Sequence, residues 1–441
     1  MNITEHIISI TYRVLKNDKR YKYYKALCQN LKLSRKELIV VQNKSIQELI
    51  QHAYNSTKYY KSLFDKNGID PLQIMNADDL KVIPELTKTI INNNLEKLKS
   101  NDKYAQTLFK VTSGGSTGVQ ATIYKSSFYE QMSRSAWLRN NKMVGWRPSF
   151  KSAWIWGSPI EHANLSNSFK ARLGFFMNQR IIFNAYNYSE KDFPLWHEKI
   201  LKFKPKVVYG YSSIILEFSK YLIANNIKLP SVEMVVSTTE KLTKREIISK
   251  AFNCPVYDQY GCREAVAIGI EEQPGKMVFT DDVAVLNTNE KNEFLLTALH
   301  SYGFPLINYK IGDIGDIKNV NKNYEDFPFP KMQLQIGRIT DNFLAIGDRK
   351  VSTSALSTYL STLNLTINQH QVIQTGYKSF IINYIPNRNT ALQKYKQIMQ
   401  ETLAEYFGLD LELKFNSVEK IPIEKSGKKL MQFKRTFNQE K

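Results

Sequence analysis

The chain has 441 residues, 42% hydrophobic and 23% charged, which predicts about two to four domains with large apolar cores. No apolar run approaches the roughly 20 residues of a membrane span, and the N-terminus lacks the pattern of a signal peptide, which predicts a mature cytoplasmic protein. The net charge of +20 favours anionic partners such as nucleotides, phosphorylated carriers, nucleic acid or an acidic membrane surface. A solvated basic surface explains the charge equally well.

Cysteine usage excludes a disulfide framework. The three cysteines, Cys28, Cys254 and Cys262, form an odd and sparse set. No CxxC pair indicates a structural metal.

The first part of the chain is predicted to be helical. Residues 44–64 place Ile46, Leu49, Ile50 and Ala53 at helical spacing. The turn residues NGID, followed by Pro, end that region, and a short helix follows that is capped near Asn76. A short strand, FKVT, then runs into a glycine-rich turn.

The middle of the chain alternates apolar runs of strand length, at 152–158, 180–186, 206–211 and 232–238, with helical stretches. This rhythm is typical of an α/β domain with a largely parallel sheet. Residues 276–320 are strand-rich, and the last hundred residues alternate as a small α+β domain. We therefore predict an α/β fold with mixed or parallel sheets in a large N-terminal domain, 1–340, and a small mobile C-terminal domain, 341–441.

The sharpest local signal is VTSGGSTG at 111–118, directly after the predicted strand. Glycine lets the backbone approach a ligand closely, and successive N–H groups in such a turn form an anion cradle, for which phosphate is the natural ligand. The pattern is neither a Walker A loop nor GxGxxG. A flexible Gly/Ser surface loop is the structural alternative.

This turn resembles the phosphate loop of the adenylate-forming superfamily, which comprises acyl-CoA synthetases, peptide-synthetase adenylation domains and luciferases. Four further motifs follow in the family's order, so the resemblance spans nearly the whole chain. It is greatest to the phenylacetate–CoA ligase-like branch, which includes proteins of capsular polysaccharide biosynthesis. The resemblance implies that the following residues bind the ATP phosphates: Thr112, Ser113, Gly114, Gly115, Ser116, Thr117 and Gly118.

The next motifs, STTEKL at 237–242 and YDQYGCRE at 257–264, imply the adenine site. By resemblance, Ser237, Thr238 and Thr239 approach the adenine and Tyr260 stacks on it, a sound role for an aromatic face. Asp258 is a further candidate, as an acceptor from the adenine amine.

The second of these motifs ends in Glu264, which the resemblance implies is a catalytic residue that holds Mg²⁺, a hard cation that prefers carboxylate and phosphate oxygens. Alone, it would be taken for a surface carboxylate after a turn. Several members of the branch carry Cys or His metal ligands after this motif. Here the segment IEEQPGKMVFTDD has neither, so we expect ATP and Mg²⁺ but no zinc.

The segment YKIGDIGDI at 309–317 offers two aspartates for the ribose. The family's Gly-Asp pair implies Asp313, because one carboxylate can accept from both hydroxyls of a diol. Asp316 is the competing candidate, and we interpret it as a turn-capping residue. In IGRITD, which follows, the resemblance implies that Arg338 reaches the ribose or phosphate and that Asp341 is the hinge of the C-terminal domain.

The last motif is KIPIEKSGKKLMQFKR at 420–435. A lysine on a Ser-Gly turn matches the family's catalytic lysine, which indicates Lys428, with Lys429 as the second candidate. A basic tail that only solvates the chain is the structural alternative.

The resemblance implies an ATP-dependent ligase. It would activate a small carboxylic acid as an acyl-adenylate with release of pyrophosphate, then transfer the acyl group, most readily to coenzyme A. The aromatic segment 154–166 could line the acyl pocket or be buried core. Transfer to a carrier thiol or to a sugar amine of a surface polysaccharide is the alternative. A basic nucleic-acid-binding protein is a distant one, because no binding module is recognisable and we expect no nucleic acid partner.

Overall fold

A computed structural model describes most of the chain. It covers residues 18–112, 121–156, 179–185, 187–318, 328–336, 343–346, 349–351, 353, 356, 360, 363, 367–386, 391–419, 421 and 433–436. The chain forms two compact units, each built from separate segments of the sequence. The first unit comprises residues 1–113, 121–148 and 257–337, and the second comprises 114–120, 149–256 and 338–441.

The first unit begins with helices and short helical turns. They are α2 (Arg20–Asn30), α3 (Arg35–Ser56), α4 (Lys58–Asn67), η1 (Asp79–Val82), α5 (Lys88–Asn93), α6 (Leu95–Leu98), η2 (Ala105–Thr107) and α7 (Ser127–Met143). A capping box starts α3, where Ser34 accepts from the N–H of Glu37 and the Glu37 side chain accepts in return. The predicted helix over 44–64 is two helices, because Thr57 leaves helical geometry and its side chain caps α4.

The strands of the first unit are antiparallel. Strands β1 (Phe109–Thr112) and β2 (Thr122–Lys125) form a separate two-stranded sheet. The other strands of this unit are neighbours in a larger sheet, in the order β11-β12-β13-β14-β10-β9-β8. These are β8 (Val256–Tyr260), β9 (Gly269–Gln273), β10 (Lys276–Phe279), β11 (Ala284–Thr288), β12 (Glu293–Ala298), β13 (Tyr309–Lys318) and β14 (Lys331–Ile336). The core of this unit gathers apolar side chains of α3 and α4 with those of β11, β12 and the segment before β13.

Two ion pairs with buried aspartates connect α3 and α7 to the segment between β10 and β11. Arg139 on α7 donates two hydrogen bonds to Asp282, at 2.8 and 2.7 Å, and both side chains are fully buried. Arg35 on α3 pairs with the neighbouring Asp281 at 2.6 Å. Because a buried charge without a partner is costly, these pairs fix which helix lies against this segment.

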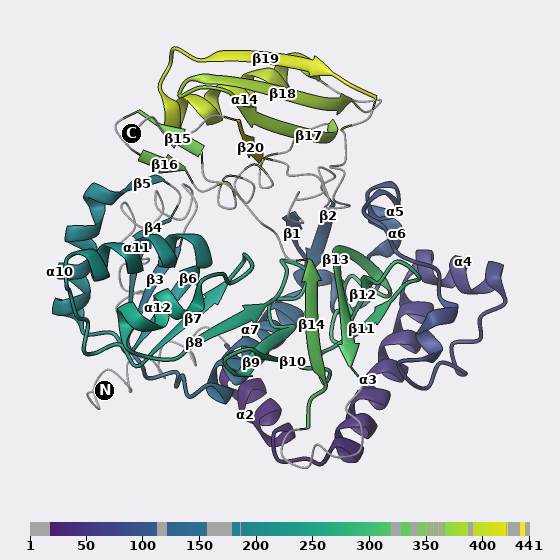
Figure 1. Cartoon of the computed structure of the whole chain (residues 1–441). Coiled ribbons are helices and arrows are strands. Elements are labelled where there is room, and N and C mark those ends of the chain that lie inside the picture. Colours follow the sequence, from purple (N-terminus) through teal and green to yellow (C-terminus); the bar gives the residue numbers. More distant parts are fainter. Residues whose placement is uncertain are drawn as a thin grey trace. The chain divides into compact units, whose positions relative to one another are not determined.

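The second unit contains a parallel sheet in the order β7-β6-β3-β4, with the helices α10, α11 and α12 packed beside it (Figure 1). Its first half comprises β3 (Ser152–Trp156), β4 (Arg180–Asn184), β5 (Asn187–Ser189), η3 (Glu190–Asp192), α10 (Phe193–Phe203), β6 (Val207–Tyr211), α11 (Ser212–Ala224), β7 (Met234–Thr238) and α12 (Arg245–Phe252). All the strands predicted for this region between 152 and 238 are confirmed.

The C-terminal part of the second unit is a four-stranded sheet in the order β19-β18-β17-β20, with α14 beside it. Its elements are β15 (Phe343–Ala345), β16 (Arg349–Val351), β17 (Ile367–Gln374), β18 (Ser379–Pro386), α14 (Leu392–Phe407), β19 (Glu412–Ser417) and β20 (Phe433–Arg435). In the same unit, β16 pairs with β5 and β15. The alternation predicted for the last hundred residues is confirmed where the structure describes them.

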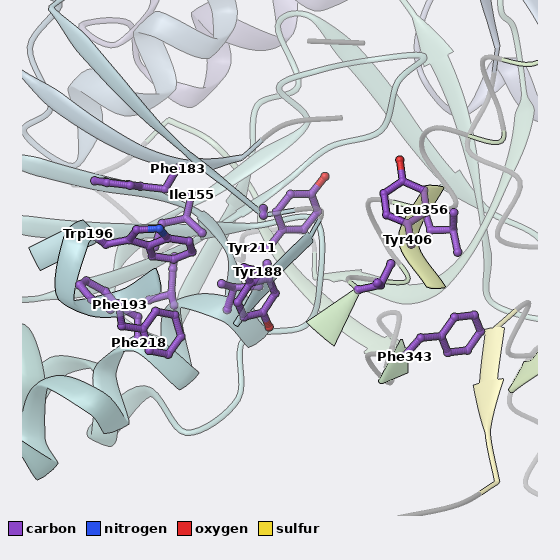
Figure 2. Packing of buried hydrophobic residues seen from close by; sticks show 14 of the residues in the cluster. Ile155, Phe183, Tyr188, Phe193, Trp196, Tyr211, Phe218, Phe343, Leu356 and Tyr406 are labelled. Atoms are coloured by element: carbon purple, nitrogen blue, oxygen red, sulfur yellow. The ribbon is translucent and has the colours of Figure 1, made fainter. Parts of the chain in front are cut away.

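Aromatic rings fill the core of the second unit (Figure 2). Phe193 and Trp196 of α10 contact each other with ring centroids 5.2 Å apart, and Phe218 of α11 lies 5.4 Å from Phe193. Such pairs add to the free energy of burial through their ring quadrupoles. The whole chain is thus a mixed α/β protein with a smaller C-terminal part, as predicted. Of the helices in the described ranges, none combines the length and apolarity required to span a bilayer.

Candidate active site

A tight turn between β8 and β9 carries Glu264. The N–H of Cys262 donates to the carbonyl of Ala265 at 2.9 Å, and the N–H of Ala265 donates to the Cys262 sulfur at 3.3 Å. A Cβ on Gly261 would lie 2.3 Å from the carbonyl oxygen of Val266, so only glycine fits there. The glycine and cysteine of this motif therefore shape the backbone that presents Glu264.

The Glu264 carboxylate is buried, with only 4% of the residue exposed. One oxygen, Oε1, accepts from the hydroxyl of Tyr309 at 2.8 Å, and the Glu264 carbonyl accepts from the hydroxyl of Tyr129 at 2.8 Å. The alternative of a surface carboxylate is therefore wrong. Burial of the thiol, and secondarily the Glu264 charge, raise the pKa of Cys262 well above its usual value, so Cys262 stays a neutral thiol beside the carboxylate.

Tyr260 and Asp313, predicted to bind adenine and ribose, are joined by a hydrogen bond. The Tyr260 hydroxyl donates to Asp313 Oδ2 at 2.9 Å. Both residues are half-buried. Gly312 has a φ of 100°, a conformation that favours glycine, and it directs the following Asp313. One oxygen of Asp313 thus already has a donor before any ligand arrives.

Asp316 differs from its predicted interpretation. It is exposed and lies within β13, opposite Gln333 of β14, so it caps no turn. The strand continues through both Gly-Asp pairs because Gly312 and Gly315 accommodate an irregular register with the neighbouring strands.

Asp258 lies on β8, with its side chain half-buried. Its N–H donates to Glu271 Oε2 at 2.8 Å, and its Oδ1 accepts from the N–H of Gln259 at 3.1 Å. These bonds hold the segment that leads to Tyr260. A role of Asp258 at the adenine amine stays a prediction.

In the second unit, Ser237, Thr238 and Thr239 lie at the carboxyl end of β7, where parallel sheets bind ligands. Thr239 has a φ of 72°, so the chain turns sharply here. The buried hydroxyls of Ser237, Ser212 and Ser213 have no hydrogen-bond partner among the described residues. Ser212 and Ser213, which start α11, were not named from the sequence as candidate ligand-binding residues. A Ser-Ser pair at the start of a helix looks the same in sequence whether it contacts a ligand or caps the helix.

Several predicted residues lie outside the described part of the chain. They are the phosphate-loop residues 113–118, Arg338, Asp341 and Lys428. Of the phosphate loop, only Thr112 is described, as the end of β1 opposite Thr122. The proposed meeting of the loop with the catalytic lysine therefore stays a prediction.

The described residues suit Mg²⁺ held by one protein carboxylate. Among them, no group of three or more His, Cys, Asp or Glu side chains could form a metal cage. Mg²⁺ commonly uses one or two carboxylates together with substrate phosphates and water, and Glu264 offers a buried carboxylate already oriented by Tyr309.

Comparison with known proteins shows what the chain resembles. The CapK C-terminal domain family matches residues 345–433. "Protein CapK" of Staphylococcus aureus is 26% identical over 435 residues, covering 96% of this chain and 95% of its own. The phenylacetate-coenzyme A ligase of Escherichia coli (strain K12) is 23% identical over 307 residues, covering 63% of this chain and 67% of its own. These matches support the resemblance to the adenylate-forming superfamily, in its phenylacetate–CoA ligase-like branch.

Solved structures show the same fold. A 2-hydroxyisobutyryl-CoA ligase with 2-HIB-AMP and CoA, in the thioesterification state, matches with a TM-score of 0.59 and 15% identity over 92% of each chain. The same ligase in its postadenylation state, with R3-HIB-AMP, matches with a TM-score of 0.57 and 14% identity over 92% of this chain and 91% of its own. At such identities the likeness establishes the adenylate-forming fold.

Proposed function

We propose that this protein activates a small carboxylic acid with ATP as an acyl-adenylate and then transfers the acyl group, most readily to coenzyme A. The observation that carries the proposal is the arrangement of Tyr260, Asp313 and Glu264 in one unit. These three residues stand at the positions of the family's nucleotide motifs in the sequence. Asp313 accepts a hydrogen bond from the Tyr260 hydroxyl, and the buried Glu264 carboxylate accepts one from Tyr309.

The first step follows from the chemistry of these groups. The acid's carboxylate oxygen forms a bond to the α-phosphorus of ATP, and the bond from that phosphorus to the pyrophosphate oxygen breaks. No general base is needed, because the nucleophile is already ionised. Mg²⁺, when bound, supplies positive charge to the phosphates. The protein contributes positioning and electrostatics. Tyr260 and Asp313 orient the nucleoside, and Tyr309 holds the Glu264 carboxylate in a fixed direction.

We also propose that residues 341–441 are the lid of this enzyme and that Lys428 bridges the acid and the α-phosphate. The match of the CapK C-terminal domain family to residues 345–433 supports such a division. In the second step the acyl carbon exchanges its bond to AMP for one to the acceptor. A sugar amine or carrier thiol of surface polysaccharide synthesis is the alternative acceptor, because the branch that the sequence resembles includes proteins of capsular polysaccharide biosynthesis.

The proposal is tested with purified protein, ATP, Mg²⁺, hydroxylamine and a panel of carboxylic acids. Acid-dependent hydroxamate supports adenylation, and its absence with every acid refutes it. Asp313→Asn should weaken ATP use, whereas Asp316→Asn, an exposed residue of the same strand, should not. Equal effects of the two variants would contradict the ribose role of Asp313. Release of free acyl-CoA separates coenzyme A from the other acceptors.

A further inference from the structure

Residues 19–36, which form α2, the turn after it and the start of α3, carry seven lysines and arginines but no aspartate or glutamate. Both arginines are engaged, because each forms an ion pair with an aspartate outside the segment. The next carboxylate along the chain, Glu37, is engaged as well, since it accepts from the N–H and the hydroxyl of Ser34. The lysines are exposed, and none of them forms an ion pair with another residue that the structure describes. We call them the basic surface: Lys19, Lys22, Lys25, Lys32 and Lys36.

The basic surface takes no part in the packing of α2. The apolar side of this helix holds it against α7, where Leu27 packs with Met132 and Ala136. A short turn then leads from α2 into α3 at one edge of the first unit (Figure 1). A partner can therefore contact the lysines without any change in the core of the unit.

Apolar side chains are exposed among these lysines. Tyr21 of α2 is 45% exposed, and the ammonium of Lys25 lies 4.9 Å from the centroid of its ring. On α3, Ile39 and Val40 are 37% and 68% exposed. They follow Lys36 by three and four residues, so they lie on the same side of the helix as that lysine. Such a mixture suits a bilayer interface, where aromatic and aliphatic side chains enter the headgroup region and lysines meet anionic lipids.

Nucleic acid is the other polyanion that such a charge could bind. Proteins favour arginine for its phosphates, because the planar guanidinium fits a phosphate with two hydrogen bonds. In residues 19–36 both arginines are engaged by aspartates, and only lysines are without an ionic partner among the described residues. The exposed side chain of Val40 also has nothing to gain from a phosphodiester chain. These observations favour a lipid surface.

We propose that the basic surface docks this protein on a membrane that contains anionic phospholipid, with Tyr21, Ile39 and Val40 at the level of the headgroups. Each lysine near such a surface strengthens binding about five-fold, so five of them strengthen it on the order of 10³-fold, which suits a reversible peripheral contact. The inference is independent of the acid and the acceptor that the protein uses.

The test is cosedimentation of the full-length protein with vesicles of phosphatidylcholine, alone or mixed with phosphatidylglycerol. Only the mixed vesicles should bind it, and salt at about 1 M, which shortens the screening length to about 3 Å, should release it. The triple variant Lys22→Gln, Lys25→Gln, Lys32→Gln should bind the mixed vesicles about 100-fold more weakly.

The matched control is Lys66→Gln, Lys199→Gln, Lys394→Gln. It lowers the net charge equally at exposed lysines of α4, α10 and α14, and should weaken binding less than about 5-fold. Equal weakening by the two triple variants would reveal an effect of net charge alone and overturn the inference. Failure to bind the mixed vesicles, or tighter binding to a single-stranded oligonucleotide than to them, would overturn it as well.

Discussion

Removal of the Tyr309 hydroxyl tests whether the tyrosine positions Glu264 for metal binding. Tyr309 is fully buried, and its hydroxyl is 2.8 Å from Oε1 of a carboxylate that is itself buried. In Tyr309→Phe that oxygen loses its donor, which costs about 1–3 kcal/mol for a buried acceptor. If Glu264 holds Mg²⁺, the less well oriented carboxylate should also bind it about 10–100-fold more weakly.

The assay is hydroxamate formation over a Mg²⁺ titration, with unfolding followed in parallel by circular dichroism. Tyr60→Phe is the matched control, because Tyr60 is equally buried in the same unit and its hydroxyl donates to the carbonyl of Pro305 and accepts from the N–H of Ile307. Both variants should lose stability, but only Tyr309→Phe should need more Mg²⁺ for half-maximal activity. The positioning role is refuted if both variants have the same Mg²⁺ dependence.

Three other substitutions follow from the structure and the proposed mechanism. Lys428→Ala should abolish adenylate formation yet leave the use of a pre-made adenylate largely intact, and equal loss of both half-reactions would contradict its role. Arg139→Leu leaves Asp282 buried without its bidentate partner and should lower the free energy of unfolding, measured in urea, by about 3–5 kcal/mol. A loss below about 1 kcal/mol would contradict the burial of this pair. Burial raises the pKa of Asp281 to about 6, so the folded state binds its proton more tightly than the unfolded chain does. The stabilisation from the protonated Asp281 carboxyl is complete below about pH 4, and roughly 3 kcal/mol of it is lost as the pH rises through about 6. Asp281→Asn should remove this pH dependence of the free energy of unfolding, measured in urea between about pH 4 and 7.

The sequence predicted the strands of the second unit because buried parallel strands are short apolar runs with recognisable ends. It joined α3 and α4 into one helix because the apolar spacing continues through Thr57, and spacing does not report the extended backbone there. Sequence pattern alone indicated a turn residue at Asp316, because Gly-Asp is common in turns. The pairing of β13 with β14 instead keeps Asp316 in a strand.

The candidate site was predictable only in part, for a physical reason. Motifs nominate residues one at a time, and the resemblance supplied Glu264, Tyr260 and Asp313. The hydroxyl that holds Glu264 comes from Tyr309, which is 45 residues away, and the second contact comes from Tyr129, which is 135 residues away. Both tyrosines look like ordinary core residues in the sequence, since no local pattern marks a hydroxyl whose partner is set by the tertiary fold.

The two tyrosine–carboxylate pairs share one physical consequence. Tyr309 holds Glu264, and Tyr260 holds Asp313, in the absence of any ligand. Each carboxylate therefore gives up less conformational freedom when it binds, which favours affinity without adding a contact. The pairs also couple residues that the motifs present as independent. Loss of the Tyr260 hydroxyl should also weaken the binding of the ribose by Asp313. The double variant Tyr260→Phe, Asp313→Asn should therefore lose less free energy of ATP binding than the sum of the losses in the two single variants.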